Sequence, residues 1–376
     1  MRRRERVRFS QEPVKSSKAK ADRGILFLTL SFLILGVIAV ADTSAPLALN
    51  TFGDSFYFVK QQLMWTVIGL GILIVSINIH YSFWKRVAYP LFGLSVIFLI
   101  LVLMPGFSSR IYGARRWLNL GFLSFQPSEV IKVSMIILFA KFAEEKKKIW
   151  YYLAPLTLIA GLIMMEPDLG TTIIVLVVGL TQVFVSGVNL FYLLGALAGG
   201  GLIGTILIFT SGYRKQRLMT FLNSAGDPLG SSYHIRQVLL ALGSGGLFGV
   251  GLGQSRQKYS FLPEVATDSV FAIIGEEMGF IGGLVIIILF SILIYKMVRV
   301  AGRAPDAFSS IVSVGVIAWI GGQMLLNLAA MTALVPLTGI PLPFFSYGGS
   351  HLTTQLMAIG ILLNISRYGH ERQKHG

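Results

Sequence analysis

The sequence contains no cysteine and few charged residues. Without cysteine, a disulfide framework and any metal or iron–sulfur centre built on thiolates are excluded. Charged residues make up 13% of the 376 residues and apolar residues 54%, and the mean hydropathy is +0.72. A soluble domain cannot bury that much apolar surface, whereas a lipid bilayer solvates it directly. The composition therefore predicts an integral membrane protein.

Acidic residues are scarce as well, with 17 Asp and Glu against 32 Lys and Arg, a net charge of +15. This excess could indicate nucleic-acid binding. However, nine of the basic residues lie in the first 23, and most of the others flank apolar runs. That placement is typical of topology signals and of contacts with anionic headgroups. We therefore expect membrane lipids, and no nucleic acid, as partners.

Several catalytic and nucleotide-binding motifs are also missing. The sequence has no HExxH pattern and no P-loop, and its glycines at 243–253 do not form a GxGxxG fingerprint. These absences argue against a membrane metalloprotease, a dinucleotide site and transport driven by ATP bound to this chain.

Ten apolar runs are long enough to cross the hydrocarbon core, which takes about 20 helical residues. They lie near residues 24–41, 61–79, 86–104, 127–143, 151–165, 169–187, 190–211, 270–295, 308–335 and 350–365. The sequence therefore predicts an all-α, polytopic integral membrane protein with about ten transmembrane helices. The main alternative is a lower count, because only Glu166-Pro167-Asp168 separates the fifth run from the sixth and the two could form one span. The first run could also be a signal peptide, but its length favours an anchor.

The charges around these runs predict the topology and the domains. An even number of spans places both termini in the cytoplasm, together with most of the basic connections. We expect a disordered, basic cytoplasmic tail at 1–23, a single transmembrane domain at 24–366 and a second cytoplasmic tail at 367–376.

Two of the connections expected on the outer face are unusual. The stretch 105–126 carries Arg110, Arg115 and Arg116 and no acidic residue to balance them. The stretch 212–269, between the seventh and eighth spans, is far longer than a connection requires. Residues 234–242 within it are apolar at helical spacing but too short to span, which indicates an interfacial or re-entrant helix.

Two carboxylates, Glu264 and Asp268, end this long extracytoplasmic loop where the eighth span begins. Asp268 could simply cap the helix or lie in its first turn, where the helix dipole favours an acid. It could instead be a general base at a partly dehydrated boundary, where burial brings the pKa of a carboxyl towards neutral pH. The local pattern leaves both interpretations open.

Other polar groups lie inside the predicted spans. Glu129 and Lys132 are three residues apart on one helix, so they could form a structural ion pair or bind a ligand. Gln323 and Asn327 form a polar stripe whose role could be no more than to hold helices together. Residues 338–350 combine two prolines with paired glycines, which favours an irregular backbone packed as the floor or wall of a cavity.

Taken in chain order, these stretches resemble the SEDS family (shape, elongation, division and sporulation) over residues 24 to 366. The resemblance rests on GARRWL at 113–118, QPSE at 126–129, EPDLGT at 166–171, YHIRQ at 233–237, LPE at 262–264 with TD at 267–268, and PLPFFSYGGS at 341–350. GLGQSRQK at 251–258 and FAIIGEE at 271–277 are more similar to the division-type branch, FtsW, than to the elongation-type branch. Ser269 departs from the family pattern, because many relatives have an aromatic residue after the aspartate.

The resemblance implies a peptidoglycan glycosyltransferase that polymerises lipid II at the outer face of the bacterial cytoplasmic membrane during cell division. It implies a class B penicillin-binding protein, a transpeptidase, as partner, along with other cell-division membrane proteins. It also implies that the aspartate matched by Asp268 is catalytic.

This chemistry gives the other polar residues candidate roles. Asp268 would take the proton of the acceptor hydroxyl, and Glu264 would tune its charge or bind substrate. The departing diphosphate would be held by Arg116 first, then Arg115, Arg236 and Lys258, because guanidinium groups bind phosphate with two hydrogen bonds. Glu129 and Lys132 complete the candidate substrate-binding set. No metal site or cofactor is predicted; a divalent cation could share the task, although no ligand cluster requires one.

Two rival functions remain at this stage. A lipid II flippase or transporter could use the intramembrane charges Glu129, Lys132, Glu276 and Glu277 to line a path for a headgroup. A non-catalytic division scaffold would need only its helix contacts with partners.

Overall fold

The computed structural model describes residues 20–111, 114–120, 123–210, 212–222, 233–259 and 264–369. The N-terminal tail predicted at 1–23 lies almost entirely outside these ranges, as do residues 370–376 of the predicted C-terminal tail. The side chains of Arg110 and Arg115 also lie outside the description.

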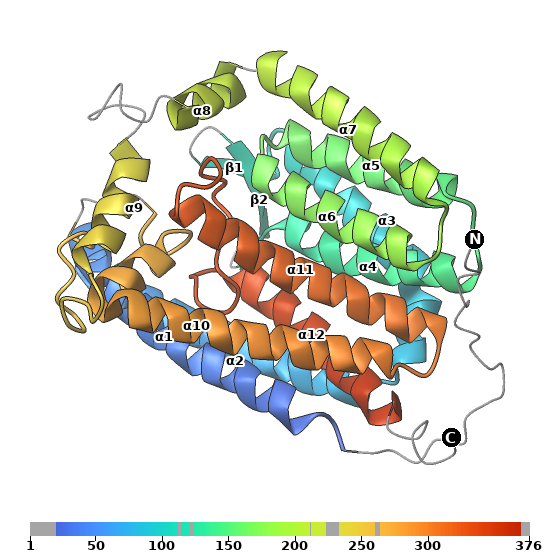
Figure 1. The fold of residues 1–376 in the computed structure, drawn as a ribbon, viewed down its shortest axis with the longest axis horizontal. Helices are drawn as coiled ribbons and strands as arrows, with labels where there is room; N and C mark the ends of the chain where they lie inside the picture. The colour runs from blue at the N-terminus through green and yellow to red at the C-terminus, as the bar shows by residue number, and fades with distance from the viewer. Residues whose placement is uncertain are drawn as a thin grey trace.

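The described residues form twelve α-helices and three short strands (Figure 1). The elements are α1 (Arg23–Phe52), α2 (Tyr57–Asn78), α3 (Tyr81–Leu103), β1 (Ser108–Ile111), β2 (Ala114–Leu120), β3 (Leu123–Phe125), α4 (Pro127–Glu144), α5 (Trp150–Met165), α6 (Leu169–Val185), α7 (Leu190–Thr210), α8 (Gly212–Leu222), α9 (Tyr233–Ser244), α10 (Val270–Gly302), α11 (Ala307–Met331) and α12 (Gly349–Gly369).

Ten of these helices coincide with the ten predicted apolar runs. By length and composition, five of the described helices can each cross a membrane, namely α1, α2, α3, α10 and α11. The helical, multi-span architecture therefore agrees with the sequence, while the count of ten crossings stays a prediction. The helix ends differ: α1 continues eleven residues beyond the predicted 41, to Phe52, and α12 reaches Gly369, inside the stretch predicted as the second tail.

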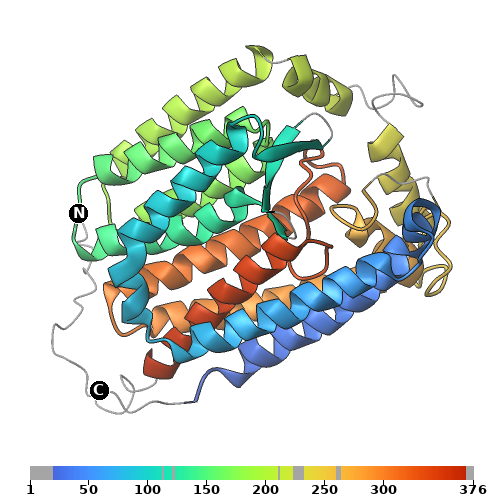
Figure 2. The same cartoon turned by 180° about the vertical axis from the view of Figure 1, so that it is seen from behind.

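The long helices lie side by side, and α4, α11 and α12 form the interior of the bundle (Figures 1 and 2). Most residues of α4 and α12 are buried, because α12 packs along α2 while α4 lies between α3 and α11. The edge helix α7 packs mainly against α6 and α8. Apolar side chains that face outward on the outer helices are exposed, as expected where lipid replaces water.

The two ends of the bundle differ in structure. At the termini end, α1 begins and α12 finishes, and the backbone N–H of Asp22 donates to Ser366 Oγ at 3.0 Å. The loop end, opposite to it, holds α9, the strands, and the irregular stretches 245–258, 264–269 and 332–348 (Figure 1). The polar candidates of the long loop and of the arginine-rich stretch therefore gather at one end.

Residues 105–126, expected to form an unusual outer connection, contain a small sheet. Strands β1, β2 and β3 form an antiparallel sheet in that order, with Ser109 opposite Trp117 and Leu118 opposite Phe125. Each pair of strands is separated by two residues that include a glycine, which is a hairpin signal. The sequence analysis did not predict these short strands, because it considered only the unbalanced arginines of this stretch.

The long stretch between α7 and α10 is structured where it is described. A helix was predicted at 234–242, and α9 confirms it; α8 was not predicted. Residues 245–253 pack against α10, which is interrupted at Gly279 with a φ of 68°. Glycine is required there because the backbone of Leu247 and Gly249 approaches it too closely for a Cβ atom.

The packing of α12 on α2 predicts a stability effect. A Cβ atom on Gly360 would lie 2.6 Å from Ser76 Cβ and 2.8 Å from Leu73 O, so Gly360→Val must push the two helices apart. We expect a loss of about 1–3 kcal/mol, seen as a lower thermal unfolding temperature in detergent. Gly71→Val on α2, where no atom lies within 4 Å of the added Cβ, is the matched control. Equal unfolding temperatures for the two variants would contradict this packing.

Candidate functional site

Residues 336–348, here called the bridging segment, form an irregular and largely buried backbone between α11 and α12. Two amide side chains of α11 hold it: Gln323 Nε2 donates to Pro341 O at 3.0 Å, and Asn327 Nδ2 donates to Ile340 O at 2.8 Å. Non-helical backbone at membrane depth needs such partners, because no water satisfies its carbonyl groups there. The sequence had placed Gln323 and Asn327 only as helix-to-helix contacts.

Asp268 lies directly beside this segment. Asn327 Nδ2, which also donates to Ile340 O, donates to the backbone carbonyl of Asp268 at 2.9 Å. The turn that carries it is tied to the bridging segment again, because the N–H of Tyr347 donates to Ala266 O at 2.8 Å. The N-cap of α10 is Ser269, so Asp268 precedes the helix and does not lie in its first turn. The side chain of Asp268 is 5% exposed.

Glu264 and Asp268 share one hydroxyl group. Thr267 Oγ1 lies 2.9 Å from Glu264 Oε2 and 3.2 Å from Asp268 Oδ1. A threonine hydroxyl has one proton to donate, so it can donate to only one of these carboxylates at a time. Glu264 is exposed and has a left-handed backbone, with a φ of 51°. The two carboxylates predicted to act together are therefore neighbours in one turn.

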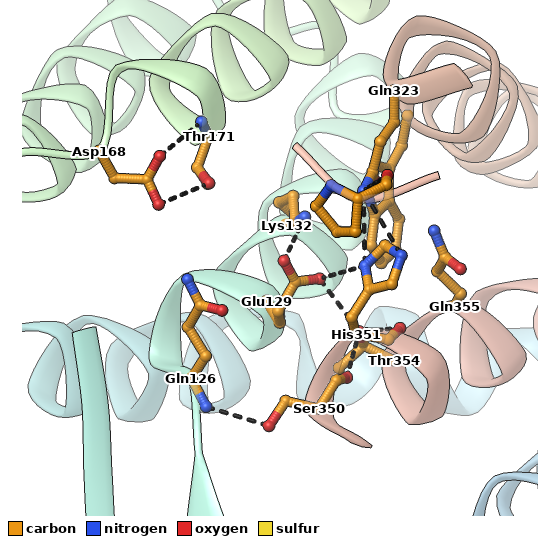
Figure 3. Close-up of polar contacts among 12 residues, drawn as sticks. Gln126, Glu129, Lys132, Asp168, Thr171, Gln323, Ser350, His351, Thr354 and Gln355 are labelled. Atoms are coloured by element: carbon orange, nitrogen blue, oxygen red, sulfur yellow. Dashed lines mark hydrogen bonds and ion pairs between the residues drawn. The ribbon is translucent and has the colours of Figure 1, made fainter. Parts of the chain in front are cut away.

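Arg116 extends from β2 to the connection between α5 and α6. Its guanidinium donates to Pro167 O at 2.6 Å and to Glu166 O at 3.3 Å, and lies 3.8 Å from Asp168 Oδ2. Asp168 in turn caps α6 by accepting from Thr171 N at 3.0 Å (Figure 3). The Arg116 side chain is 32% exposed, so part of this charge faces outward.

The bridging segment connects Arg116 with Asp268. Gly170, two residues after Asp168, packs so closely on this segment that a Cβ atom would lie 2.7 Å from Thr338 O. On Gly339, a Cβ atom would lie 3.9 Å from Asp268 Oδ2. Residues 338–340 thus contact the start of α6, next to Arg116, and the Asp268 carboxylate. Asp268, the predicted base, and Arg116, the first predicted phosphate ligand, are therefore connected through the bridging segment.

Glu166 is a buried carboxyl in the same connection, and the sequence had not given it a role. Its side chain is 0% exposed, and neither of its oxygens has a hydrogen-bond partner among the described residues. Burial and the nearby charge of Asp168 raise the pKa of Glu166 to about 9, although Arg116 opposes this shift. Glu166 is therefore protonated at neutral pH.

Of the other two predicted arginines, Arg236 lies on α9 and Arg115 lies on β2 next to Arg116. Arg236 is exposed on α9, a helix whose His234 Nε2 lies 3.0 Å from Ser269 Oγ, next to Asp268. Arg115 is part of β2, but its side chain lies outside the description. The structure thus places α9, which carries Arg236, beside Ser269.

Lys258 occupies an internal position that its predicted role did not anticipate. Its ammonium lies 2.6 Å from Asp42 Oδ1 on α1 and 2.9 Å from Glu277 Oε1 on α10, and the residue is 5% exposed. Burial lowers the pKa of Lys258, but hydrogen bonds to these carboxylates outweigh it and raise the pKa. We therefore infer that Lys258 has a structural role, because two carboxylates already neutralise the positive charge that would otherwise bind a diphosphate.

Glu276 and Glu277, which a flippase could have used to line a path for a headgroup, bond to the loop that precedes α10. Glu277 accepts from the N–H groups of Gly253 and Ser255, each at 3.0 Å, and Glu276 accepts from Arg256 N at 3.1 Å and from Ser255 Oγ. Both carboxylates thus fix residues 253–258 onto α10.

Glu129 and Lys132 form an internal ion pair on α4 (Figure 3). Lys132 Nζ lies 2.8 Å from Glu129 Oε1 and 4.8 Å from the centre of the Trp319 ring, and Lys132 is 1% exposed. His351 Nδ1 lies 3.3 Å from Glu129 Oε2, so the pair also binds α12 to α4. The sequence analysis missed His351, whose only signal was a lone histidine at the start of the last apolar run. Of the two open interpretations, these contacts favour the structural ion pair.

Among the described residues, no group of three or more histidine or acidic side chains is arranged to hold a metal ion. Two cavities lie away from Asp268. An apolar groove of about 710 Å³ runs along α5 from Trp150 to Met165, and a basic cavity of about 180 Å³ lies at the termini end.

Together, the fold and the site define a polytopic helical membrane protein with a buried acid and a guanidinium group joined at one end. The chain belongs to the family of cell cycle proteins FtsW, RodA and SpoVE, whose model matches residues 23–371. This confirms the SEDS family resemblance found in the sequence.

Curated relatives match almost the whole chain. It is 42% identical to stage V sporulation protein E of Bacillus subtilis over 363 residues, 94% of this chain and 99% of that protein. It is 36% identical to the probable peptidoglycan glycosyltransferase FtsW of Trichlorobacter lovleyi, with 93% of each chain covered.

Two solved structures share the fold. A chain from a peptidoglycan synthase complex that coordinates polymerisation and crosslinking superposes with a TM-score of 0.76 and 27% identity, covering 93% of this chain and 99% of that one. The rod shape determining protein RodA of Thermus thermophilus gives a TM-score of 0.68 and 28% identity, covering 93% and 98%.

Glu166 leads to a prediction about the pH dependence of stability. The folded protein holds the Glu166 proton more tightly than the unfolded chain, where the pKa is near the ordinary 4.5. The resulting stability is complete below that value and is lost as the pH rises towards about 9. Glu166→Gln has no such proton to lose. Its unfolding temperature should therefore match the wild type at about pH 5 and exceed it increasingly at higher pH, as thermal unfolding in detergent would measure. Parallel pH profiles for the two proteins would contradict a buried, protonated Glu166.

Proposed function

We propose that this protein polymerises lipid II into glycan strands during cell division, with Asp268 as the general base. The enzyme class predicted from the sequence, a peptidoglycan glycosyltransferase, is confirmed by family membership and by the names of several curated relatives. The observation that carries the proposed site is the bridging segment, which contacts Asp268 on one side and the start of α6, beside Arg116, on the other.

The reaction needs a base on the acceptor side. Asp268 would remove the proton of a sugar hydroxyl on the acceptor as its oxygen bonds to the anomeric carbon of the donor. The bond between that carbon and the diphosphate breaks in the same step, and undecaprenyl diphosphate leaves with the electron pair. The low exposure of Asp268 keeps its carboxyl largely out of bulk water, as expected for a group that acts on bound substrate.

The departing diphosphate needs positive charge at the same end. Arg116 is our first candidate, because its guanidinium is part exposed and is held in place by the carbonyl groups of Glu166 and Pro167. Arg115 and Arg236 are the further candidates. Glu264 would tune the charge of Asp268 through the shared Thr267 hydroxyl.

Unpaired polar atoms around the bridging segment support a polar ligand. Thr338 Oγ1, Asn327 Oδ1 and both carboxyl oxygens of Glu166 are buried without a hydrogen-bond partner among the described residues. Buried polar atoms in proteins are almost always paired, so this local concentration favours a site that substrate or water completes.

Location and partners complete the proposal. The protein is a multi-span membrane protein, and we propose that it lies in the bacterial cytoplasmic membrane with the loop end outside and both termini inside, as its basic connections suggest. Residues 24–366 would form its single transmembrane domain. The similarity to a chain of a synthase complex that combines polymerisation with crosslinking supports a class B penicillin-binding protein as partner. Other cell-division membrane proteins are further proposed partners.

The role of Asp268 can be tested in liposomes that contain purified protein and lipid II. Asp268→Asn should lower strand synthesis by about 10²–10⁴-fold, the usual contribution of a general base, while folding is unchanged. Asp54→Asn is the matched control, because Asp54 is an acid at the same end that pairs with the exposed Lys60. Retained synthesis in Asp268→Asn would exclude the base role. Headgroup translocation by the wild type without polymer would instead establish the transporter.

The role of Arg116 predicts a different kinetic pattern. Arg116→Gln removes the charge that would stabilise the leaving diphosphate, so kcat/KM for lipid II should fall by about 10²–10³-fold. Lys60→Gln, which removes an exposed cation at the same end, should leave kcat/KM unchanged. Thermal unfolding in detergent must accompany the assay, because Arg116 also binds two carbonyl groups. Unchanged turnover in a folded Arg116→Gln would remove this residue from the site.

A further inference from the structure

A second charged site lies at the termini end, far along the bundle from Asp268. A cavity of about 180 Å³ opens where α1, α10 and α12 meet, and its wall includes Lys296, Arg299, Arg303 and Ser366. A single water molecule needs roughly 10–15 Å³ on this scale. The space therefore admits a group of several non-hydrogen atoms.

The three cations converge on this space from the last turns of α10 and from Arg303, its C-cap residue. Lys296, Arg299 and Arg303 are separated by three and four residues, the spacing at which helical side chains are neighbours. Among the described residues, no carboxylate lies within 4.0 Å of any of them, and none of the three has an ion pair.

Two acids at this end that the structure describes, Asp22 and Asp306, already cap helix N-termini. Asp22, which also lines the cavity, accepts from the N–H groups of Gly24 at 2.8 Å and Ile25 at 3.1 Å. Asp306 accepts from Ser309 N at 2.7 Å and from the hydroxyl of Tyr81 at 2.8 Å. The positive charge lining the cavity therefore exceeds the negative charge.

A topology signal alone does not require this arrangement. Other basic residues at the same end do have acidic partners: Lys85 lies 2.6 Å from Glu144, and Lys147 lies 3.4 Å from Glu145. Cations that only orient the helices could all be paired or fully solvated. Three cations around one cavity, none with an acidic partner in the part of the chain that the structure describes, are instead typical of an anion site.

We propose that this cavity binds the phosphate group of an anionic phospholipid in the cytoplasmic leaflet. Two guanidinium groups and an ammonium group suit phosphate oxygens, since guanidinium donates two parallel hydrogen bonds. The exposed side chains of Ile292, Tyr295 and Val298, within about one turn of the cations on α10, give the acyl chains an apolar surface. The assignment to that leaflet rests on the proposed orientation, whereas the phosphate site itself does not.

Native mass spectrometry of the full-length protein can test this site. The protein would be released from micelles that contain equal amounts of phosphatidylglycerol and phosphatidylcholine. The wild type should retain phosphatidylglycerol in preference, and Lys296→Gln/Arg303→Gln should lower that preference roughly tenfold or more. The control is Lys146→Gln/Lys148→Gln, which removes two exposed cations next to the Lys147–Glu145 pair at the same end.

The outcomes separate the possible sources of binding. Equal losses in the double variant and the control would mean that general charge, not the cavity, attracts the lipid, and would overturn the proposal. Inorganic phosphate titrated without phosphatidylglycerol provides a second arm. If it stabilises the wild type against heat as strongly as phosphatidylglycerol does, the ligand is free phosphate and the lipid assignment is wrong. Because Lys296 packs against Gly24, the single variant Arg299→Gln repeats the test if the double variant does not fold.

Discussion

The side-chain amide of Asn327 connects the two segments on which the site depends. Its nitrogen donates to the backbone carbonyl groups of Asp268 and Ile340, which lie 59 and 13 residues away in the chain. Both carbonyl groups are in non-helical backbone at the end of a membrane bundle, where an unpaired group is costly. The same amide therefore satisfies the backbone and fixes Asp268 relative to the bridging segment. Gln323 and Gln355 extend this support by bonding to Pro341 and Phe344.

Most of the buried charge in the bundle serves its structure. Lys258 joins α1 to α10 through Asp42 and Glu277, and Glu129 joins α4 to α12 through His351. Removing one partner from such a pair typically costs about 3–5 kcal/mol, because the other charge is left buried. This explains why the charged residues deepest in the fold are poor candidates for substrate contacts. The proposed site instead includes groups with incomplete partners, namely the part-exposed Arg116 and the buried carboxyl of Glu166.

The two ends of the bundle carry different kinds of charge. At the loop end, acidic and basic groups are brought together by a three-stranded sheet, a turn and the bridging segment. At the termini end, three cations at the C-terminal end of α10 line a cavity, while Asp22 and Asp306 cap helices. This asymmetry fits a protein that carries out its chemistry on one side of a membrane and contacts lipid headgroups on the other.

Local sequence determined the helices, because a run of apolar residues about 20 long has few alternatives to a helix in a bilayer. It also marked Asp268 and Arg116, the first as an acid at a helix start and the second as a cation without a nearby acid. Tertiary structure alone decided which charges are paired. Lys258 meets Asp42 across 216 residues, and His351 meets Glu129 across 222. The physical reason is that periodicity along the chain specifies which face of a helix is buried, whereas the partner of a buried charge depends on which helices pack together.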